Sequence, residues 1–325
     1  MSAPDPAPPA GLPGYLPRRP GVDRFVPVRG LDYHVICWGD ASLVTPERPA
    51  LFMVHGWMDV GASFQFVVDA LAEREGAARY IVAADWRGFG GTRVPPTDSY
   101  WFADYLGDLD ALLHHDELGL SGDAPLDLLG HSMGGNVVMG YAGVRPERIR
   151  RLVNLEGFGL PETRPHHAPQ RLRQWLDELR TAQQLRDYAS SGAVAERLRQ
   201  NNPRLDAAHA AWLAAHWAER REDGRWHILG DPAHKRTNPV LYRKDEVLET
   251  WKRITAPVLW VEGNETDVTK WWGDRYPRED FESRLAVVPA LSRALLHDCG
   301  HMLHHDQPQA LAECLQAFLD APQPG

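Results

Sequence analysis

Two hydrophobic patterns alternate along most of the chain: short continuous apolar runs, and segments whose apolar residues recur with a helical period. Continuous apolar runs are typical of strands buried on both faces, and their alternation with amphipathic helices is typical of a parallel sheet. The pattern predicts strands at residues 25–28, 33–38, 50–54, 79–84, 126–129, 149–155, 257–261 and 293–296. It predicts helices at residues 63–73, 101–113, 136–142 and 309–319. We therefore expect an α/β protein.

The rhythm of strands and helices breaks at Pro161. From His166 to about Arg221 the sequence is dense in Ala, Leu, Arg and Gln with helical periodicity, and we expect no strand there. The strand pattern resumes at Pro257, so a helical insertion should follow the sixth strand. The predicted organisation is a flexible, Pro-rich extension at residues 1–22, a sheet domain at 23–160 and 245–325, and the insertion at 161–244.

A G-x-S-x-G motif, Gly130-His131-Ser132-Met133-Gly134, joins an apolar strand to a helical segment. So tight a strand-to-helix turn brings backbone segments close together, which requires small residues on both sides of the serine. The serine hydroxyl is then exposed at the carboxyl edge of the sheet. A glycine-rich turn with an incidental serine is the alternative, but the flanking strand and helix favour Ser132 as a nucleophile.

A serine hydroxyl needs a base, and histidine serves because its pKa lies near neutrality. His301 follows the last predicted strand and precedes the final helix. In a doubly wound sheet, that loop opens on the same edge as Ser132. His297, His304 and His305 are lesser alternatives, so His301 is the predicted base.

The third catalytic residue should be a carboxylate that orients the imidazole and stabilises its protonated form. Asp267 is the predicted acid because it lies in the loop after strand 257–261. Glu265, in the same loop, and Glu156, at the end of strand 149–155, remain alternatives. A hydrogen bond that pins the insertion is the preferred role for Glu156.

Charge develops on the carbonyl oxygen when a serine attacks an ester, and backbone N–H groups must stabilise it. The N–H of Met133, directly after the nucleophile, is one predicted donor. The N–H of Trp57, in the loop after strand 50–54, is the second. Gly56 should let this loop approach the substrate closely.

These motifs together resemble the α/β-hydrolase superfamily, from about Phe25 to Ala321. The motifs that carry the resemblance are His55-Gly56-Trp57, Asp85-Trp86-Arg87-Gly88, the Gly130–Gly135 segment and Gly300-His301. The chain order of Ser, Asp and His is also that of α/β hydrolases. His55-Gly56-Trp57-Met58-Asp59 and the elbow resemble the serine hydrolase-like and esterase branches. Haloalkane dehalogenases and epoxide hydrolases are similar in layout but carry Asp at the nucleophile position, and Ser132 argues against both.

The resemblance implies a mostly parallel eight-stranded sheet with flanking helices and a helical cap, inserted after strand 6, over the active site. Trp175, Trp212 and Trp217 of the cap are candidates for lining a pocket for an apolar or aromatic ester. The implied reaction is ester hydrolysis through an acyl-enzyme on Ser132. Cofactor-free haloperoxidases and carbon–carbon bond hydrolases with a similar triad remain alternatives, as does a non-catalytic ligand receptor of the same fold.

The composition of the chain limits which partners and cofactors are expected. The net charge of −9 and the absence of a long basic run make nucleic acid and anionic membranes poor partners. Three widely spaced cysteines favour neither disulfides nor a zinc site. No secretory signal or membrane span is recognised, so a cytoplasmic protein is expected, with a homodimer as an open alternative to a monomer. No cofactor or metal is expected, because the neighbours His304, His305 and Asp306 would face different ways on a helix.

Overall fold

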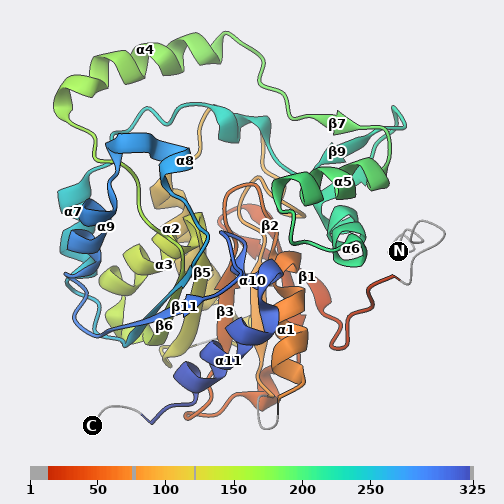
Figure 1. The fold of residues 1–325 in the computed structure, drawn as a ribbon, viewed down its shortest axis with the longest axis vertical. Coiled ribbons are helices and arrows are strands. Elements are labelled where there is room, and N and C mark those ends of the chain that lie inside the picture. The colour runs from red at the N-terminus through yellow and green to blue at the C-terminus, as the bar shows by residue number, and fades with distance from the viewer. Residues whose placement is uncertain (1–13, 75–77, 121, 323–325) are drawn as a thin grey trace.

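The computed structural model describes residues 14–74, 78–120 and 122–322. An eight-stranded sheet with the order β1-β2-β4-β3-β5-β6-β10-β11 forms its centre (Figure 1). Its strands are β1 (Val22–Val28), β2 (Leu31–Trp38), β3 (Leu51–Val54), β4 (Ile81–Ala84), β5 (Leu126–His131), β6 (Ile149–Leu155), β10 (Val258–Gly263) and β11 (Leu291–Leu296). β2 pairs antiparallel with both β1 and β4, and all other neighbouring strands of this sheet are parallel. The predicted mostly parallel eight-stranded sheet is confirmed.

Helices cover both faces of this sheet (Figure 1). On one face α1 (Gln65–Ala72) packs against α11 (Pro308–Leu319), whose apolar side chains Leu311, Leu315 and Leu319 recur at helical spacing and are buried. The other face is covered by α2 (Phe102–Leu113), α3 (Met133–Val144), α7 (Lys244–Trp251) and α9 (Arg278–Leu285). Two apolar layers therefore fix the strands, and with them the loops at the carboxyl edge.

The insertion between β6 and β10 contains strands as well as helices. Its helices are α4 (Ala168–Leu179), α5 (Ser191–Asn201) and α6 (Ala207–Trp217). Its strands β7 (Asp187–Tyr188), β9 (Trp226–Ile228) and β8 (Ala218–Arg220) form a small antiparallel sheet in that order. The expectation that no strand lies between His166 and Arg221 is therefore wrong, because strands of two or three residues are too short to give a periodic signal.

Backbone hydrogen bonds dock the insertion onto the loop that follows β4. The N–H of Gly90 donates to the carbonyl of Leu229 at 2.9 Å, and the N–H of Asp231 donates to the carbonyl of Gly88 at 2.8 Å. The insertion therefore adjoins the end of the sheet where the parallel strands terminate. This is the position that a cap over a strand-edge site requires.

The predicted N-terminal extension lies only partly within the described residues, since residues 1–13 fall outside them. The segment that follows is held against α1. The hydroxyl of Tyr15 donates to Asp69 at 2.6 Å, and the backbone N–H groups of Arg18 and Arg19 donate to the same carboxylate at 2.9 and 3.0 Å. Hydrogen bonds to α1 thus hold Tyr15, Arg18 and Arg19, and the flexibility of the extension stays a prediction.

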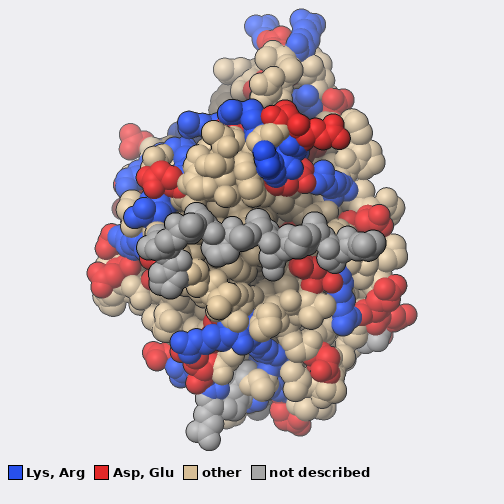
Figure 2. All heavy atoms as spheres, turned by 90° about the vertical axis from the view of Figure 1, so that its right-hand side faces the viewer, with Lys and Arg blue, Asp and Glu red and all other residues tan. Residues whose placement is uncertain are grey.

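Charges of both signs are intermixed on the face seen in Figure 2, with no broad area of a single sign. Within the described residues, no helix combines the length and the apolar character needed to cross a bilayer. The three cysteines, Cys37, Cys299 and Cys314, are all free thiols.

One histidine of β2, His34, makes folding stability depend on pH. His34 lies between two carboxylates, with Nδ1 at 2.7 Å from Asp85 and Nε2 at 3.1 Å from Asp23. Burial alone would lower the pKa of His34, but the hydrogen bonds and charges of Asp23 and Asp85 outweigh it and raise the pKa to about 10. The stability that His34 contributes is therefore fully present below its unfolded pKa of about 6.5 and is lost as the pH rises towards 10.

We expect the stability difference between the wild type and His34→Gln to be largest near pH 6 and to shrink steadily up to pH 10. Urea unfolding at several pH values measures this difference. His114→Gln, which removes a more exposed histidine near the end of α2, is the matched control for the loss of a histidine side chain. A His34→Gln difference that stays constant with pH would contradict the assignment.

Candidate active site

Ser132 occupies a strained turn between β5 and α3. Its backbone has φ 51° and ψ −114°, a conformation that L residues rarely adopt. A Cβ at Gly130 would lie 2.3 Å from the carbonyl oxygen of Gly134, and one at Gly134 would lie 2.5 Å from that of Val54. Backbone contacts on both sides of the serine therefore require glycine, which is the physical reason for the motif.

The sheet brings His301 to Ser132 from a loop 169 residues away in sequence. His301 Nε2 lies 3.0 Å from Ser132 Oγ, so the hydroxyl can donate to the imidazole. The carbonyl of His301 accepts a hydrogen bond from His131 Nε2 at 2.8 Å, which holds the histidine loop against the nucleophile turn. The His301 side chain is 24% exposed, so substrate can reach it.

The carboxylate against this imidazole belongs to Glu156. Its Oε2 lies 2.6 Å from His301 Nδ1, and its Oε1 accepts the backbone N–H of Gly263 at 2.7 Å. The Glu156 side chain is fully buried, and its backbone also has a positive φ, 54°. From the sequence, Glu156 was one of two alternatives to Asp267 as the acid, and a hydrogen bond that pins the insertion was its preferred role.

The predicted acid Asp267 is corrected by this geometry. Asp267 lies exposed just before the short helix α8 (Thr269–Trp272), and its carboxylate accepts hydrogen bonds from the backbone and hydroxyl of Thr269. These hydrogen bonds lower the pKa of Asp267. Glu265, the other alternative, pairs with Arg204. Neither carboxylate contacts His301.

Strand order explains why Glu156 reaches the histidine. β6 lies between β5, which carries the nucleophile, and β10. Glu156 directly follows the last residue of β6, so its side chain starts at the sheet edge. Beyond β10 the N–H of Glu265 donates to the carbonyl of Cys299 at 2.9 Å, and the carboxylate of Asp267, two residues on, accepts from Thr269 instead of from His301. An acid at a strand end followed by glycine, Glu156-Gly157, was the available sequence signal.

The two predicted oxyanion donors border Ser132. Met133 is the first residue of α3, where a backbone N–H has no acceptor within its own helix. Gly56 brings the loop after β3 against the nucleophile, since a Cβ at this position would lie 3.1 Å from the Cβ of Ser132. Trp57 follows Gly56 in this loop, and its residue is 52% exposed. The assignment of Trp57 and Met133 to an oxyanion hole stays a prediction.

His55 braces this loop, a role that the sequence did not reveal. Its Nδ1 donates to the carbonyl of Gly56 at 2.7 Å, while its Nε2 accepts the N–H of Trp86 at 2.9 Å. Burial lowers the pKa of His55, in accord with the neutral ring that this donor–acceptor pair requires. His55 thus ties the loops after β3 and β4 together behind the nucleophile.

The predicted pocket tryptophans make contacts within the protein. Trp175 donates to Ser99 Oγ at 2.8 Å, Trp217 donates to Asp59 at 3.0 Å, and Trp212 packs against Phe66 with ring centroids 5.6 Å apart. The tryptophan beside the imidazole is Trp271 of α8, whose ring lies 4.5 Å from that of His301 and which is 43% exposed. None of these contacts of the three cap tryptophans is to Ser132 or His301. Their place in a substrate pocket stays a prediction.

The sheet order, the strained serine turn and the adjoining histidine define an α/β hydrolase. Residues 49–308, most of the chain, match the family described as the alpha/beta hydrolase fold, and the chain belongs to this family. A serine hydrolase-like protein of Danio rerio is 23% identical over 94% of this chain and 91% of its own length. The similarity to this serine hydrolase-like protein thus extends along nearly the whole of both chains.

Two further relatives show how varied the similar proteins are. Epoxide hydrolase 2 of Siraitia grosvenorii is 31% identical, but the match covers only 40% of this chain and 37% of that protein. The solved structure described as a thioesterase domain from the curacin biosynthetic pathway superposes with a TM-score of 0.73 at 26% identity, over 91% of this chain and 98% of that domain.

Proposed function

We propose that this α/β hydrolase cleaves carboxylic esters through an acyl-enzyme on Ser132, with His301 as the base and Glu156 as the orienting acid. The observation that carries the proposal is the unbroken line of contacts from the Glu156 carboxylate through the imidazole to the hydroxyl, at 2.6 and 3.0 Å. A hydroxyl, a base and an acid in this arrangement are the parts that activate a serine nucleophile.

Acylation is the first step of the proposed mechanism. Ser132 Oγ attacks the ester carbonyl while its proton passes to His301 Nε2, and the negative charge of Glu156 stabilises the imidazolium. The N–H groups of Met133 and Trp57 stabilise the oxyanion of the tetrahedral intermediate. Its collapse breaks the bond to the alcohol oxygen, which leaves with the proton from His301.

Deacylation repeats these roles with water. His301 Nε2 takes a proton from a water molecule, whose oxygen attacks the acyl carbon. The second intermediate releases the carboxylic acid and returns the proton to Ser132 Oγ. The five residues named for the two steps come from four strand-end loops, and no further group is needed to balance the reaction.

Aromatic side chains beside the triad support an apolar acyl or alcohol group in the substrate. Trp57 and Trp271 are both large, about half exposed, and follow strands that end at the catalytic edge. Exposed aromatic surface beside a reactive group gains free energy when an apolar substrate covers it. The related thioesterase domain suggests acyl thioesters as a second substrate to test.

A substrate panel tests the proposed function. It should contain p-nitrophenyl acetate, butyrate and octanoate, an acyl thioester, a styrene-type epoxide, a diketone and a peracid-formation assay. We expect turnover of the p-nitrophenyl esters, because Ser132 can form the acyl intermediate. Cleavage of the epoxide, diketone cleavage or peracid formation without ester hydrolysis would contradict the proposal, as would no turnover at all.

A further inference from the structure

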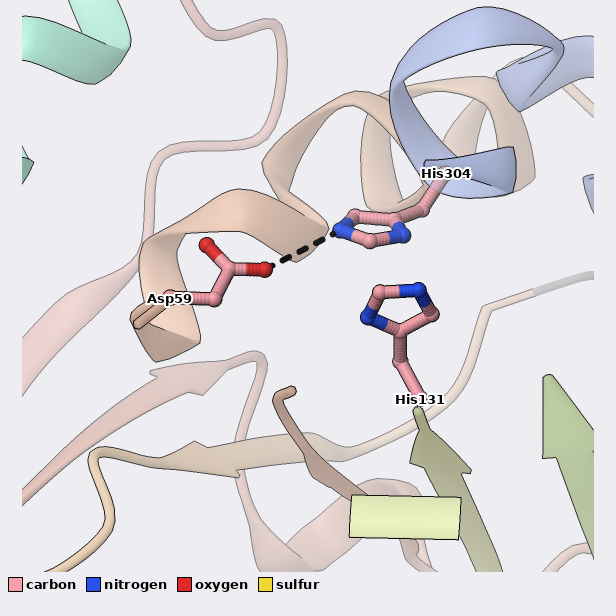
Figure 3. Close-up of side chains that lie close together, drawn as sticks. All are labelled: Asp59, His131 and His304. Carbon is pink, nitrogen blue, oxygen red and sulfur yellow. Dashed lines mark ion pairs between the residues drawn. The ribbon is translucent and has the colours of Figure 1, made fainter. Parts of the chain in front are cut away.

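A second cluster of polar side chains lies behind the triad. Asp59, His131 and His304 come from the loop after β3, the end of β5 and the short helix α10 (Leu303–Asp306), and they are 3%, 2% and 0% exposed. Figure 3 shows the three side chains turned towards one another, with the carboxylate and both rings around a common centre. The proposed ester hydrolysis uses none of their side chains as an acid, base or nucleophile.

The atoms that face this centre lack hydrogen-bond partners among the described residues. Asp59 Oδ1 accepts from Val60 N at 2.9 Å and Trp217 Nε1 at 3.0 Å, while Oδ2 accepts from none. Oδ2 lies 3.5 Å from His304 Nε2, an ion-pair distance too long for a good hydrogen bond. Neither nitrogen of His304 has a hydrogen bond. Buried polar atoms without partners are costly, so the cluster suits a ligand.

A hydrogen bond fixes the tautomer of His131. Its Nε2 lies 2.8 Å from the carbonyl oxygen of His301, which can only accept, so Nε2 carries the proton. His131 Nδ1 then presents a lone pair, and it has no hydrogen-bond partner. An imidazole whose second nitrogen donates to a carbonyl is the arrangement found at histidine metal ligands.

We propose that Asp59 Oδ2, His131 Nδ1 and His304 Nε2 bind a divalent transition-metal ion such as Zn²⁺. One candidate ligand atom from each residue lies within 4.8 Å of the others. Two imidazoles and one carboxylate favour Zn²⁺ over Ca²⁺ or Mg²⁺, which prefer oxygen ligands. Ligand atoms about 2 Å from a tetrahedral ion lie roughly 3.4 Å apart, so binding draws the three side chains together.

Two alternatives explain the contacts less completely. An Asp59–His304 ion pair without metal leaves His131 Nδ1 unsatisfied. A second group of possible ligands, Asp187, Asp223 and His227, lies in the partly exposed small sheet. There His227 Nε2 already bonds to Asp223 at 2.7 Å, and Asp187 pairs with Arg225 at 2.8 Å. The buried cluster is therefore the stronger site.

A metal ion in this cluster would act on the triad. The rings of His131 and His301 have centroids 4.8 Å apart. A nearby dication disfavours the imidazolium that His301 must become during acylation, because like charges repel strongly where little water screens them. Bound Zn²⁺ should therefore lower kcat while leaving KM nearly unchanged. This effect on rate rests on the proposed function, whereas the binding of the ion does not.

Zn²⁺ binding is measured on the full, untagged chain after removal of metals with EDTA, by competition with a chromogenic chelator. We expect one tightly bound ion per wild-type chain. Asp59→Asn and His304→Gln should each weaken binding by at least tenfold, because each removes a ligand. His227→Gln and His305→Gln are matched controls: the first disables the exposed group, the second removes the neighbouring histidine, and both should bind as the wild type does.

The outcomes separate the explanations. Absence of tight binding to the wild type overturns the site, and so does unchanged binding by His304→Gln. Loss of binding in His227→Gln alone would assign the ion to the exposed group and also overturn it. Co²⁺ added to the wild type provides a test without variants that might misfold: tetrahedral absorption bands should appear and Zn²⁺ should abolish them. Failure of ester hydrolysis would leave these binding results intact, so the two proposals fail separately.

Discussion

Ser132→Ala is expected to reduce kcat for p-nitrophenyl butyrate by about 10⁵- to 10⁶-fold, close to the loss seen when a serine hydrolase loses its nucleophile. The attacking atom must lie within reach of His301 Nε2, and among the described residues Ser132 Oγ is the hydroxyl bonded to it, at 3.0 Å. The residual rate should reflect binding and the oxyanion donors alone. Steady-state kinetics on protein expressed without a contaminating esterase measures the loss.

Ser190→Ala is the matched control for this substitution. Ser190 caps α5 in the insertion, where its side chain accepts the N–H of Ala193 at 3.1 Å. Its loss should cost about 1 kcal/mol of stability and leave kcat unchanged. Comparable activity in Ser132→Ala and the wild type would refute the nucleophile.

Glu156→Gln is expected to reduce kcat by about 10³- to 10⁴-fold, while Asp267→Asn stays within about twofold of the wild type. A neutral amide neither stabilises the imidazolium nor secures the tautomer in which His301 Nε2 accepts the serine proton. The Asp267 carboxylate accepts hydrogen bonds from Thr269, at the start of α8. Kinetics of both variants with the same ester give the comparison.

Folding controls accompany the comparison of acids. Glutamine at position 156 keeps an oxygen that can accept the N–H of Gly263, so the turn after β6 should survive. Thermal unfolding of Glu156→Gln checks this. Glu265→Gln, which removes the partner of Arg204, should retain activity. A larger loss in Asp267→Asn or Glu265→Gln than in Glu156→Gln would contradict the assignment of the acid.

Features with local causes could be predicted from the sequence. The buried strands show as apolar runs because both of their faces are covered, and β3, β5 and β6 lie where those runs lie. The turn at Ser132 was recognisable because close backbone contacts between adjacent segments require glycine at its flanking positions. The match of residues 49–308 to the α/β hydrolase fold agrees with this part of the sequence analysis.

The acid could not be predicted, because its placement depends on how loops are directed after their strands end. Asp267 has a suitable position in the chain, but its carboxylate accepts hydrogen bonds from Thr269, the first residue of α8. Glu156 is placed by the adjacency of β6 and β5, which only the strand order reveals. The same holds for the cluster of Asp59, His131 and His304, which are far apart in the chain.

The insertion was predicted in outline but not in detail. Its helices have a period that shows in the sequence, whereas β7, β8 and β9 are too short to give one. Which tryptophans face the substrate depends on tertiary packing. Trp271, beside His301, lies in a helix of four residues that gives no periodic signal.

The site of acyl attachment is the most direct test of Ser132 as the nucleophile. The wild type is mixed with the fastest ester of the panel, quenched in acid within milliseconds, digested and mapped by mass spectrometry. We expect an acyl group on the peptide that contains Ser132, accumulating with the first turnover and absent from Ser132→Ala. An acyl group on another residue, or rapid turnover without any covalent intermediate under these conditions, would contradict it.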